Sequence, residues 1–164
     1  MKYDIAVVII NYNSSSYTIN CIKSIIEKTD KNTSYQLVIV DNASQKKDYE
    51  SLKSYTDSLG SNSILIRSKI NTGFGGGNML GVNHCHAKYI SFVNNDTIFQ
   101  NDCLNKLKGF MDSNSRIGVC GPQAFKENGE LLPTIDHFAS LQREIIGRWF
   151  LEFINPNCQV SQGC

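Results

Sequence analysis

A strong excess of charge of one sign is missing from this 164-residue sequence. The 16 lysine and arginine residues are balanced by 15 aspartate and glutamate residues, which gives a formal net charge of +1. Such a chain has no global field that would attract nucleic acid or an anionic membrane. If its ligand carries phosphates, something other than bulk positive charge must neutralise them.

A targeting segment and a membrane span are also missing. The first apolar run ends at Asn11, whereas a signal peptide needs a basic stretch, a longer apolar stretch and small residues at a cleavage site. No stretch approaches the roughly 20 apolar residues of a membrane span. We therefore expect a soluble, cytoplasmic chain. The sequence is also compatible with peripheral attachment at the inner face of a membrane.

Clustered metal ligands are lacking as well. The six cysteines are scattered without a C-x-x-C pair, so they are expected to be reduced thiols rather than a disulfide framework. His84 and His86 lie two positions apart, the wrong spacing for two ligands on one helical face, and His137 is alone. A zinc site built from these residues is therefore not expected.

What the sequence does contain is a regular alternation of apolar runs with amphipathic segments. Expected strands are residues 5–10, 37–40, 64–66, 89–93 and 117–120, and expected helices are residues 17–28, 48–59, 78–86 and 104–111. This order predicts an α/β fold with a mostly parallel sheet and right-handed crossovers. At this length we expect a single domain, residues 1–164.

The character of the sequence changes after Pro122. Asn128 and Gly129 predict the turn of a β-hairpin. Residues 140–153 then show a mixed helical pattern that carries the only tryptophan, Trp149, which we expect in the core rather than against a sugar.

Polar residues follow four of the predicted strands directly. Ligands of open α/β sheets bind outside the carboxyl ends of the strands, so these residues are candidates for a binding site. Turn formation and helix capping explain such residues at any one position, but explain four strand ends together less well. The four groups are residues 11–13 (Asn-Tyr-Asn), 41–44 (Asp-Asn-Ala-Ser), 67–71 (from Arg67 to Asn71) and 94–97 (Asn-Asn-Asp-Thr).

A glycine-rich segment, residues 71–77, precedes the third predicted helix. It lacks the third glycine of the dinucleotide fingerprint in register, and no Gly-Lys-Ser/Thr follows, which excludes a P-loop. Consecutive glycines still let backbone N–H groups and a helix N-terminus approach a phosphate. The alternative is a flexible loop that only lets the helix pack close to the sheet.

Four ordered motifs in this chain resemble those of the family 2 glycosyltransferases, and among them the bacterial rhamnosyltransferase-like members. They are residues 7–13, 38–44, 71–78 with Gly81, and 92–97. The resemblance implies a GT-A fold, a Rossmann-like three-layer domain. It further implies transfer of a sugar, with inversion, from a nucleotide-diphospho-sugar of the UDP or dTDP type to a saccharide or lipid-linked acceptor in bacterial cell-surface polysaccharide synthesis.

The resemblance also implies roles for individual residues. Tyr12 would border or stack on the nucleobase, and Asp41 would accept a hydrogen bond from a pyrimidine N–H. Residues 71–78 would line the ribose and the diphosphate. The donor-binding residues implied in this way are Asn11, Tyr12, Asn13, Asp41, Asn42, Asn71, Gly73, Phe74, Gly75, Gly76, Asn78, Asn94, Asn95 and Asp96.

Residues 94–96 stand where the family carries its D-x-D metal motif, and they depart from it because Asn94 is an amide. By the resemblance, Asp96 would be the one protein carboxylate on a Mg²⁺ or Mn²⁺ ion, with the diphosphate and waters as the remaining ligands. Such an ion would stabilise the leaving diphosphate without a basic groove.

A general base for the acceptor hydroxyl has no counterpart in this sequence. The family's base is an Asp or Glu in a later motif, after a strand of small residues that residues 160–164 resemble at its start. No catalytic residue is therefore assigned, and the base is expected beyond Cys164. Residues 1–122 would then be the nucleotide-sugar-binding part and residues 123–164 the start of the acceptor side.

Two other functions remain open at this point. The first is a nucleotide-binding domain without transferase activity. The second is a nucleotidyltransferase that makes an activated sugar, but its phosphate loop normally follows the first strand and carries glycine and basic residues. Residues 10–16 have neither glycine nor lysine, which places this alternative third.

Overall fold

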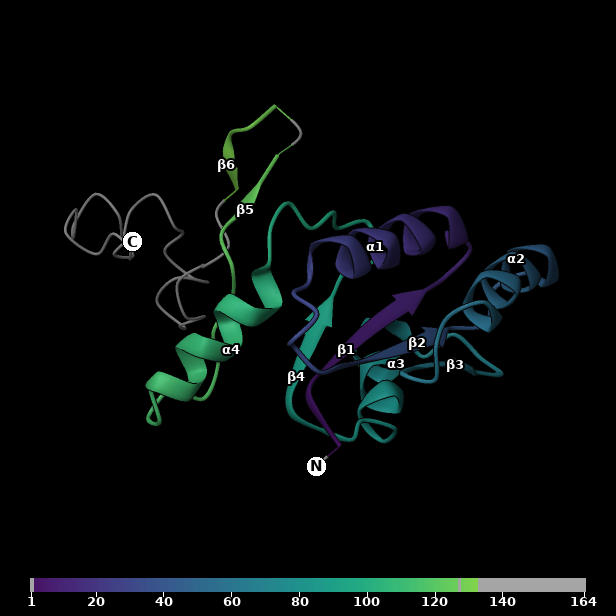
Figure 1. Cartoon of the computed structure of the whole chain (residues 1–164). Coiled ribbons are helices and arrows are strands. Elements are labelled where there is room, and N and C mark those ends of the chain that lie inside the picture. The colour runs from purple at the N-terminus through teal and green to yellow at the C-terminus, as the bar shows by residue number, and fades with distance from the viewer. Residues whose placement is uncertain (1, 127, 133–164) are drawn as a thin grey trace, which may run out of the picture. The chain divides into compact units, whose positions relative to one another are not determined.

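The computed structural model of this chain describes residues 2–126 and 128–132. Its elements (Figure 1) are β1 (Tyr3–Asn11), α1 (Ser15–Lys28), β2 (Tyr35–Asp41), α2 (Lys46–Asp57), β3 (Ser63–Arg67), α3 (Gly73–Val82), β4 (Ala87–Val93), α4 (Cys103–Ser113), β5 (Ala124–Phe125) and β6 (Leu131–Leu132). The chain divides into two units after Cys120.

The first unit is built on a parallel four-stranded sheet in the order β3-β2-β1-β4. β1 is central, and its residues 5–9 are buried because strands and helices cover it on all sides. Asn11 at the end of β1 pairs with Asp41 at the end of β2, which in turn pairs with Arg67 at the end of β3. The α/β fold with a parallel sheet is confirmed, and the register brings three polar side chains to one edge.

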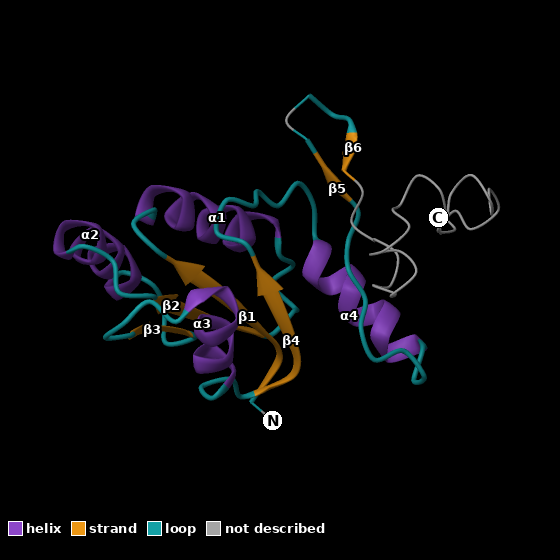
Figure 2. Ribbon diagram, turned by 180° about the vertical axis from the view of Figure 1, so that it is seen from behind, coloured by secondary structure: helices purple, strands orange, loops and turns teal. Residues whose placement is uncertain are grey.

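Helices cover both faces of this sheet (Figure 2). On one face α1, α2 and α4 pack on the odd-numbered residues of β1 and β2, and on the other face α3 packs on even-numbered ones. The main core consists of Ile5, Val7, Ile9, Cys21, Ile22, Ile25, Leu37, Ile39, Leu52, Phe99 and Leu104. The continuous apolar runs of β1 and β2 follow from this two-sided burial.

Helix α3 lies against the sheet through glycine rather than through large side chains. A Cβ atom on Gly81 would lie 2.5 Å from Cγ1 of Val8, and one on Gly77 would lie 3.2 Å from Cδ1 of Ile10. The helix also begins at Gly73, so the predicted start at Asn78 was wrong. The glycine-rich segment is therefore itself the first part of the helix, and close packing explains its later glycines.

The predicted strand over residues 117–120 is wrong, whereas the predicted hairpin is confirmed. Residues 117–120 form no strand, and Val119 is 90% exposed, so no neighbouring element covers this apolar run within the described part of the chain. The predicted hairpin is confirmed in the second unit, where β5 and β6 pair antiparallel and Gly129 adopts a φ of 83°. The predicted helix over residues 140–153, with Trp149, lies outside the described residues.

Cys21, Cys85, Cys103 and Cys120 are free thiols in the structure. Among the described residues, no helix combines the length and the apolar character needed to cross a membrane.

The close approach of α3 to the sheet gives a first prediction. Gly81→Ala should lower the free energy of unfolding by about 1–3 kcal/mol, because the new methyl group overlaps a buried, β-branched valine that has no room to move. Urea unfolding followed by circular dichroism measures the change.

The matched control is Gly75→Ala in the same helix. No atom lies within 4 Å of a Cβ added at Gly75, so this substitution should be neutral or should stabilise the helix by up to about 1 kcal/mol. Equal losses in both variants would show that α3 does not pack as described.

Candidate functional site

A pocket of about 340 Å³ opens at the carboxyl ends of the strands. It receives residues from the ends of β1, β2 and β4 and from the start of α3. Its wall consists of Ile10, Tyr12, Ser14, Asn42, Asn71, Gly73, Phe74, Val93, Asn94, Asn95 and Asp96. We call it the carboxyl-edge pocket, and it brings together most of the donor-binding residues that the sequence predicts.

Asn11 lies behind this wall, fully buried, and its side-chain amide is the centre of a polar network. Its Nδ2 lies 3.1 Å from Oδ1 of Asp41, 3.0 Å from Oγ of Ser44 and 2.9 Å from Oδ2 of Asp48. Its Oδ1 accepts a hydrogen bond of 2.8 Å from the hydroxyl of Thr18. Asn11 therefore connects β1 to β2, α1 and α2 rather than facing the pocket.

Asp41 is also fully buried and does not line the pocket. Besides Asn11, its carboxylate accepts the backbone N–H of Ser44 at 3.3 Å and lies 3.5 Å from Nε of Arg67. The guanidinium of Arg67 is fixed in turn, because it donates to the Ser44 carbonyl and stacks 4.0 Å from the ring centre of Tyr49. The role of Asp41 in nucleobase recognition stays a prediction.

Asp48, in the first turn of α2, is the member of this network that links α2 to the start of α1. Its Oδ1 accepts the backbone N–H of Ser15 at 2.9 Å, which satisfies an N-terminal donor of α1. Burial pushes the pKa of the Asp48 carboxyl upward, but hydrogen bonds from Asn11, Ser15 and Ser44 outweigh it and hold the pKa below its ordinary value of 3.8. The native network thus favours the charged form of Asp48.

The glycine-rich segment is held in place by the side chain of Asn42. Its Nδ2 donates to Oδ1 of Asn71 at 2.9 Å and to the carbonyl of Gly73 at 3.1 Å, while its Oδ1 accepts the N–H of Thr72 at 3.1 Å. Gly73 itself has a φ of 71°, a conformation that glycine adopts without steric cost. The start of α3 is therefore fixed relative to β2.

The first N–H groups of α3 come from the predicted phosphate-binding segment. The first four N–H groups of a helix have no partner within the helix, and they carry its positive dipole end. Gly75 and Gly76 lie in this first turn but are not on the pocket wall, and Asn78 is buried one turn further on. The helix start can thus face an anion without any basic side chain.

Two aromatic rings contribute to the pocket wall. Tyr12 is 50% exposed and Phe74 is 60% exposed, although large aromatic side chains usually bury most of their surface. Such rings offer flat apolar faces for a planar ligand.

Asn13, the third residue of the motif at the end of β1, has a structural role. It adopts a φ of 51°, and its Oδ1 accepts the N–H of Gln45 at 2.8 Å.

The loop after β4 is attached to α1. Nδ2 of Asn95 donates to Oγ of Ser14 at 2.7 Å and to Oγ1 of Thr18 at 3.0 Å. Asp96 follows on the pocket wall. Burial, and to a smaller extent the negative charge of Asp96, raises the pKa of the Cys21 thiol to about 12. Cys21 is therefore not a nucleophile at neutral pH.

Among the residues that the structure describes, Asp96 is the only carboxylate on the wall of the carboxyl-edge pocket. The described residues contain no group of three or more His, Cys, Asp or Glu side chains that could hold a metal ion by themselves. This donor set suits Mg²⁺ or Mn²⁺, which are often bound through one or two carboxylates together with substrate phosphates. It does not suit a metal that needs a complete cage of protein ligands.

Sequence reasoning missed two residues of the network, namely Thr18 and Asp48. Arg67 was among the strand-end candidates, but the donor-binding residues implied by the resemblance do not include it. Thr18 precedes Ile22 by four positions and Ile25 by seven, which puts a polar residue in the buried stripe of α1. Asp48 gave no signal beyond its place in the first turn of a predicted helix.

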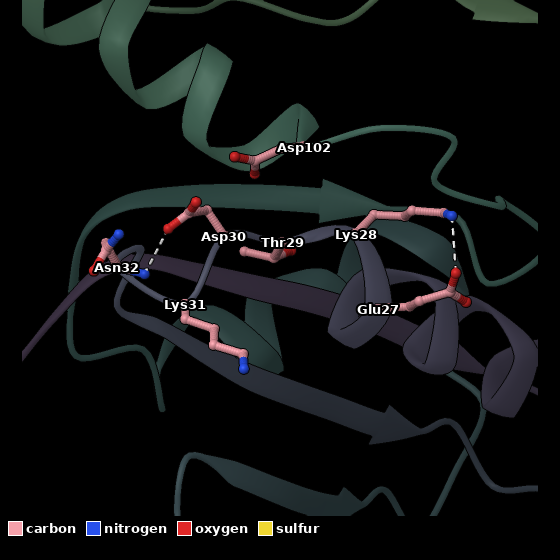
Figure 3. Close-up of a pocket in the computed structure, with 7 residues that line it drawn as sticks. All are labelled: Glu27, Lys28, Thr29, Asp30, Lys31, Asn32 and Asp102. Atoms are coloured by element: carbon pink, nitrogen blue, oxygen red, sulfur yellow. Dashed lines mark hydrogen bonds and ion pairs between the residues drawn. The ribbon is translucent and has the colours of Figure 1, made fainter.

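A second pocket, of about 580 Å³, lies where α1 ends (Figure 3). Its charged side chains are mostly engaged locally: Lys28 pairs with Glu27 at 2.8 Å, Asp30 accepts the N–H of Asn32 at 2.7 Å, and Asp102 caps α4. Within the described ranges, 2–126 and 128–132, no aromatic ring and no glycine lines it. Its size alone therefore does not make it the better candidate.

The chain matches the family model described as glycosyl transferase family 2 over residues 6–159. No curated protein sequence matches it. Among solved structures it is similar to S. aureus TarS 1-349, with 19% identity, a TM-score of 0.59, and coverage of 76% of this chain and 40% of that chain. The complex of the same protein with UDP-GlcNAc gives 19% identity, a TM-score of 0.60, and coverage of 76% and 38%.

A second similar structure is the mannosyltransferase PcManGT from Pyrobaculum calidifontis in complex with GDP-Man and Mn²⁺. It shares 14% identity and a TM-score of 0.56 over 66% of this chain and 31% of that chain. At these identities the likeness shows the fold, which is the GT-A-like α/β fold expected from the sequence. The chain spans at most two fifths of the length of these structures.

The lowered pKa of Asp48 gives a second prediction. Asp48→Asn should be less stable than the wild type at pH 7, and the difference should disappear in acid. A carboxyl whose pKa is lower in the folded state stabilises the fold above its unfolded pKa, and this contribution is lost as the pH falls through the folded value. Urea unfolding from pH 7 down to about pH 3 measures it.

Glu50→Gln is the control, because it removes an exposed carboxylate from the same helix and a surface ion pair with Lys46 contributes little. A stability difference between Asp48→Asn and the wild type that stays constant over the whole pH range would contradict the network described for Asp48.

Proposed function

Since the chain belongs to glycosyl transferase family 2, we propose that it binds a nucleotide-diphospho-sugar in the carboxyl-edge pocket and acts as the donor side of an inverting glycosyltransferase. The observation that carries this proposal is the composition of one pocket wall. Two exposed aromatic rings, several amides, a helix N-terminus and a single carboxylate meet there, and these are the groups that a base, a ribose, a diphosphate and a metal ion need.

The nucleobase would lie against Tyr12 and Phe74. Both rings are exposed on the pocket wall, and stacking on an aromatic ring is open to any base. Asp41 and Arg67 end β2 and β3 and do not line the pocket, so contact of either side chain with the base edge would need a rearrangement. Related structures carry UDP-GlcNAc and GDP-Man, which supports a nucleotide-sugar donor without selecting its base.

The diphosphate would lie between the start of α3 and Asp96. No lysine or arginine among the described residues lines the pocket, so the negative charge of the donor would have to be met by N–H groups in the first turn of α3 and by a divalent ion on Asp96. A bound Mg²⁺ or Mn²⁺ would neutralise the charge that develops on the leaving diphosphate. Asn94 would offer an amide where a carboxylate would bind the ion more tightly.

In the transfer itself, the acceptor oxygen forms a bond to the anomeric carbon while the bond from that carbon to the diphosphate breaks. The acceptor's proton must pass to a base. Asp96 would be unsuited to this task if it held a metal ion, and no other carboxylate among the described residues lines the pocket. We therefore assign the base to none of the described residues.

The finer assignments follow the resemblance. They are membership of the rhamnosyltransferase-like group, a UDP or dTDP type of donor, a saccharide or lipid-linked acceptor, and a role in bacterial cell-surface polysaccharide synthesis. From the sequence we also propose a cytoplasmic location that is compatible with peripheral attachment at the inner face of the membrane.

A nucleotide-binding domain without transfer is the alternative, and the lack of a second carboxylate on the pocket wall, within the part of the chain that the structure describes, favours it. Incubation of the full chain with a nucleotide-sugar donor, Mn²⁺ and candidate acceptors separates the two functions, because only a transferase would form a glycosylated product.

The aromatic wall gives a third prediction. Tyr12→Ala should weaken binding of UDP or GDP by about 1–3 kcal/mol, the usual contribution of one stacked base. Isothermal titration calorimetry measures this change. Tyr17→Ala is the control, since Tyr17 is 61% exposed on α1 but does not line the pocket, and the same loss in both variants would remove Tyr12 from the site.

The metal assignment gives a fourth prediction. Asp96→Asn should abolish the gain in UDP-GlcNAc or GDP-Man affinity that Mn²⁺ provides, because the nearly isosteric amide carries no charge to bind the ion. Asp30→Asn, which changes an acidic residue of the second pocket, should keep the gain. The same dependence on Mn²⁺ in Asp96→Asn and the wild type would show that the ion binds elsewhere.

A further inference from the structure

The loop that carries Asp96 runs alongside α1 and takes its position from this helix. Beyond the two bonds from Asn95, the thiol of Cys21 lies 3.7 Å from the carbonyl of Asn94, and the hydroxyl of Ser24 accepts the N–H of Phe99 at 3.0 Å. Side chains of α1 therefore hold the loop at several points along its length.

Residues 94–97 form a four-residue turn. The N–H of Thr97 donates to the carbonyl of Asn94 at 3.1 Å, so Asn95 and Asp96 are its two central residues. The side chain of Asn95 is fixed on α1, and Asp96, the next residue of the same tight turn, lies on the wall of the pocket. Whatever fixes Asn95 therefore also orients the carboxylate of Asp96.

The hydroxyl of Thr18 is the buried contact in this arrangement. A hydroxyl has one hydrogen and can accept through two lone pairs. The hydrogen goes to Oδ1 of Asn11 at 2.8 Å, a shorter contact than the 3.3 Å to the carbonyl of Ser14. The oxygen accepts the amide of Asn95 at 3.0 Å, so the bonds run in one direction, from Asn95 through Thr18 to Asn11.

From Asn11 the same chain of bonds continues to Asp41 at the end of β2. Thr18 is fully buried and does not line the carboxyl-edge pocket, so it has no place to contact a ligand. It nevertheless stands between the strand end behind the proposed nucleobase site and the turn with the proposed metal ligand. Chains of buried hydrogen bonds strengthen one another, and a missing member leaves its neighbours unpaired.

We propose that Thr18 is a positioning residue that links the nucleobase side of the site to its metal side. Its hydroxyl fixes Asn95, and through the turn it holds the carboxylate of Asp96 where a divalent ion on the donor diphosphate can reach it. This inference rests on the proposed function of the same pocket. It adds a residue on α1 that none of the four sequence motifs contains.

The test compares Thr18→Val, Thr18→Ser and Thr56→Val with the wild type. Valine keeps the shape of threonine and removes its hydroxyl, whereas serine keeps the hydroxyl. Thr56 is a buried threonine on α2, and its hydroxyl donates a hydrogen bond to the carbonyl of Lys53 in the same helix. Thr56→Val is therefore the matched control for loss of a buried hydroxyl. UDP and GDP are titrated into each variant by calorimetry, with and without Mn²⁺.

In Thr18→Val, the gain in nucleotide affinity on adding Mn²⁺ should fall by about 10- to 100-fold, the usual effect of removing a residue that orients a metal ligand. Thr18→Ser should restore most of the gain, and Thr56→Val should keep all of it. A folded Thr18→Val variant with the full Mn²⁺ gain would overturn the proposal, because Thr18 would then serve stability alone.

A second measurement needs neither metal nor nucleotide. In the free chain, backbone ¹⁵N relaxation should show residues 94–97 more mobile in Thr18→Val than in the wild type, and unchanged in Thr56→Val. Unchanged mobility in Thr18→Val would overturn the proposal even if no nucleotide binds. Increased mobility in a chain that binds no nucleotide would instead reject the proposed function and leave the positioning contact intact.

Asn95→Ala removes the other partner of the same hydrogen bond, and it replaces Thr18→Val in the test if that variant fails to fold. It should lose the Mn²⁺ gain to a similar degree, and the double variant with Thr18→Val should lose less than the sum of the two single losses, because both changes break the bond between Asn95 and Thr18. Fully additive losses would show that the two residues act separately.

Discussion

The buried side-chain amide of Asn11 is the interaction on which the rest of the site depends. An amide without access to water must find all its partners in the protein, or the fold loses the hydrogen bonds that water would have provided. Asn11 finds them in Thr18, Asp41, Ser44 and Asp48, which lie on or next to α1, β2 and α2. The carboxyl ends of two strands and the starts of two helices are thereby held in one arrangement.

Neutral amides repeat this role around the pocket. Asn42 holds the start of α3 against β2, and Asn95 holds the turn after β4 against α1. Because amides position backbone segments without adding charge, they leave Asp96 as the one formal charge on the wall among the described residues. In the proposed function, a helix N-terminus and a metal ion would then meet the charge of the diphosphate, which agrees with a chain whose net charge is only +1.

The strands and the polar edge of the sheet could be predicted from the sequence, because β-branched runs such as residues 5–10 and the polar residues after them are local signals. Other features depend on tertiary packing. The start of α3 at Gly73 was missed because glycines favour a loop in isolation, whereas here Asn42 holds them and Gly81 needs the close approach to Val8. The run at 117–120 was mistaken for a strand because apolar residues alone do not supply a strand partner.

The site shows the same division. Tyr12 and Asp96 could be placed from the strand ends and Phe74 from the glycine-rich segment. The burial of Asp41 and the partners of Asn11 could not, because hydrogen bonds between residues such as Asn11 and Asp48 connect positions far apart in the sequence. Thr18 shows this most clearly. A polar residue in the buried stripe of a helix indicates a buried partner but does not say which one.

The central claim is that a nucleotide and a divalent ion bind at the carboxyl edge of the sheet, and ¹H–¹⁵N NMR spectra of the chain test it most directly. UDP and GDP should shift the signals of residues 11–14, 41–44 and 71–78. A trace of paramagnetic Mn²⁺ added to the complex should broaden the signals around Asp96 first. Shifts and broadening centred instead on residues 27–32 and Asp102, the wall of the second pocket, would contradict the account.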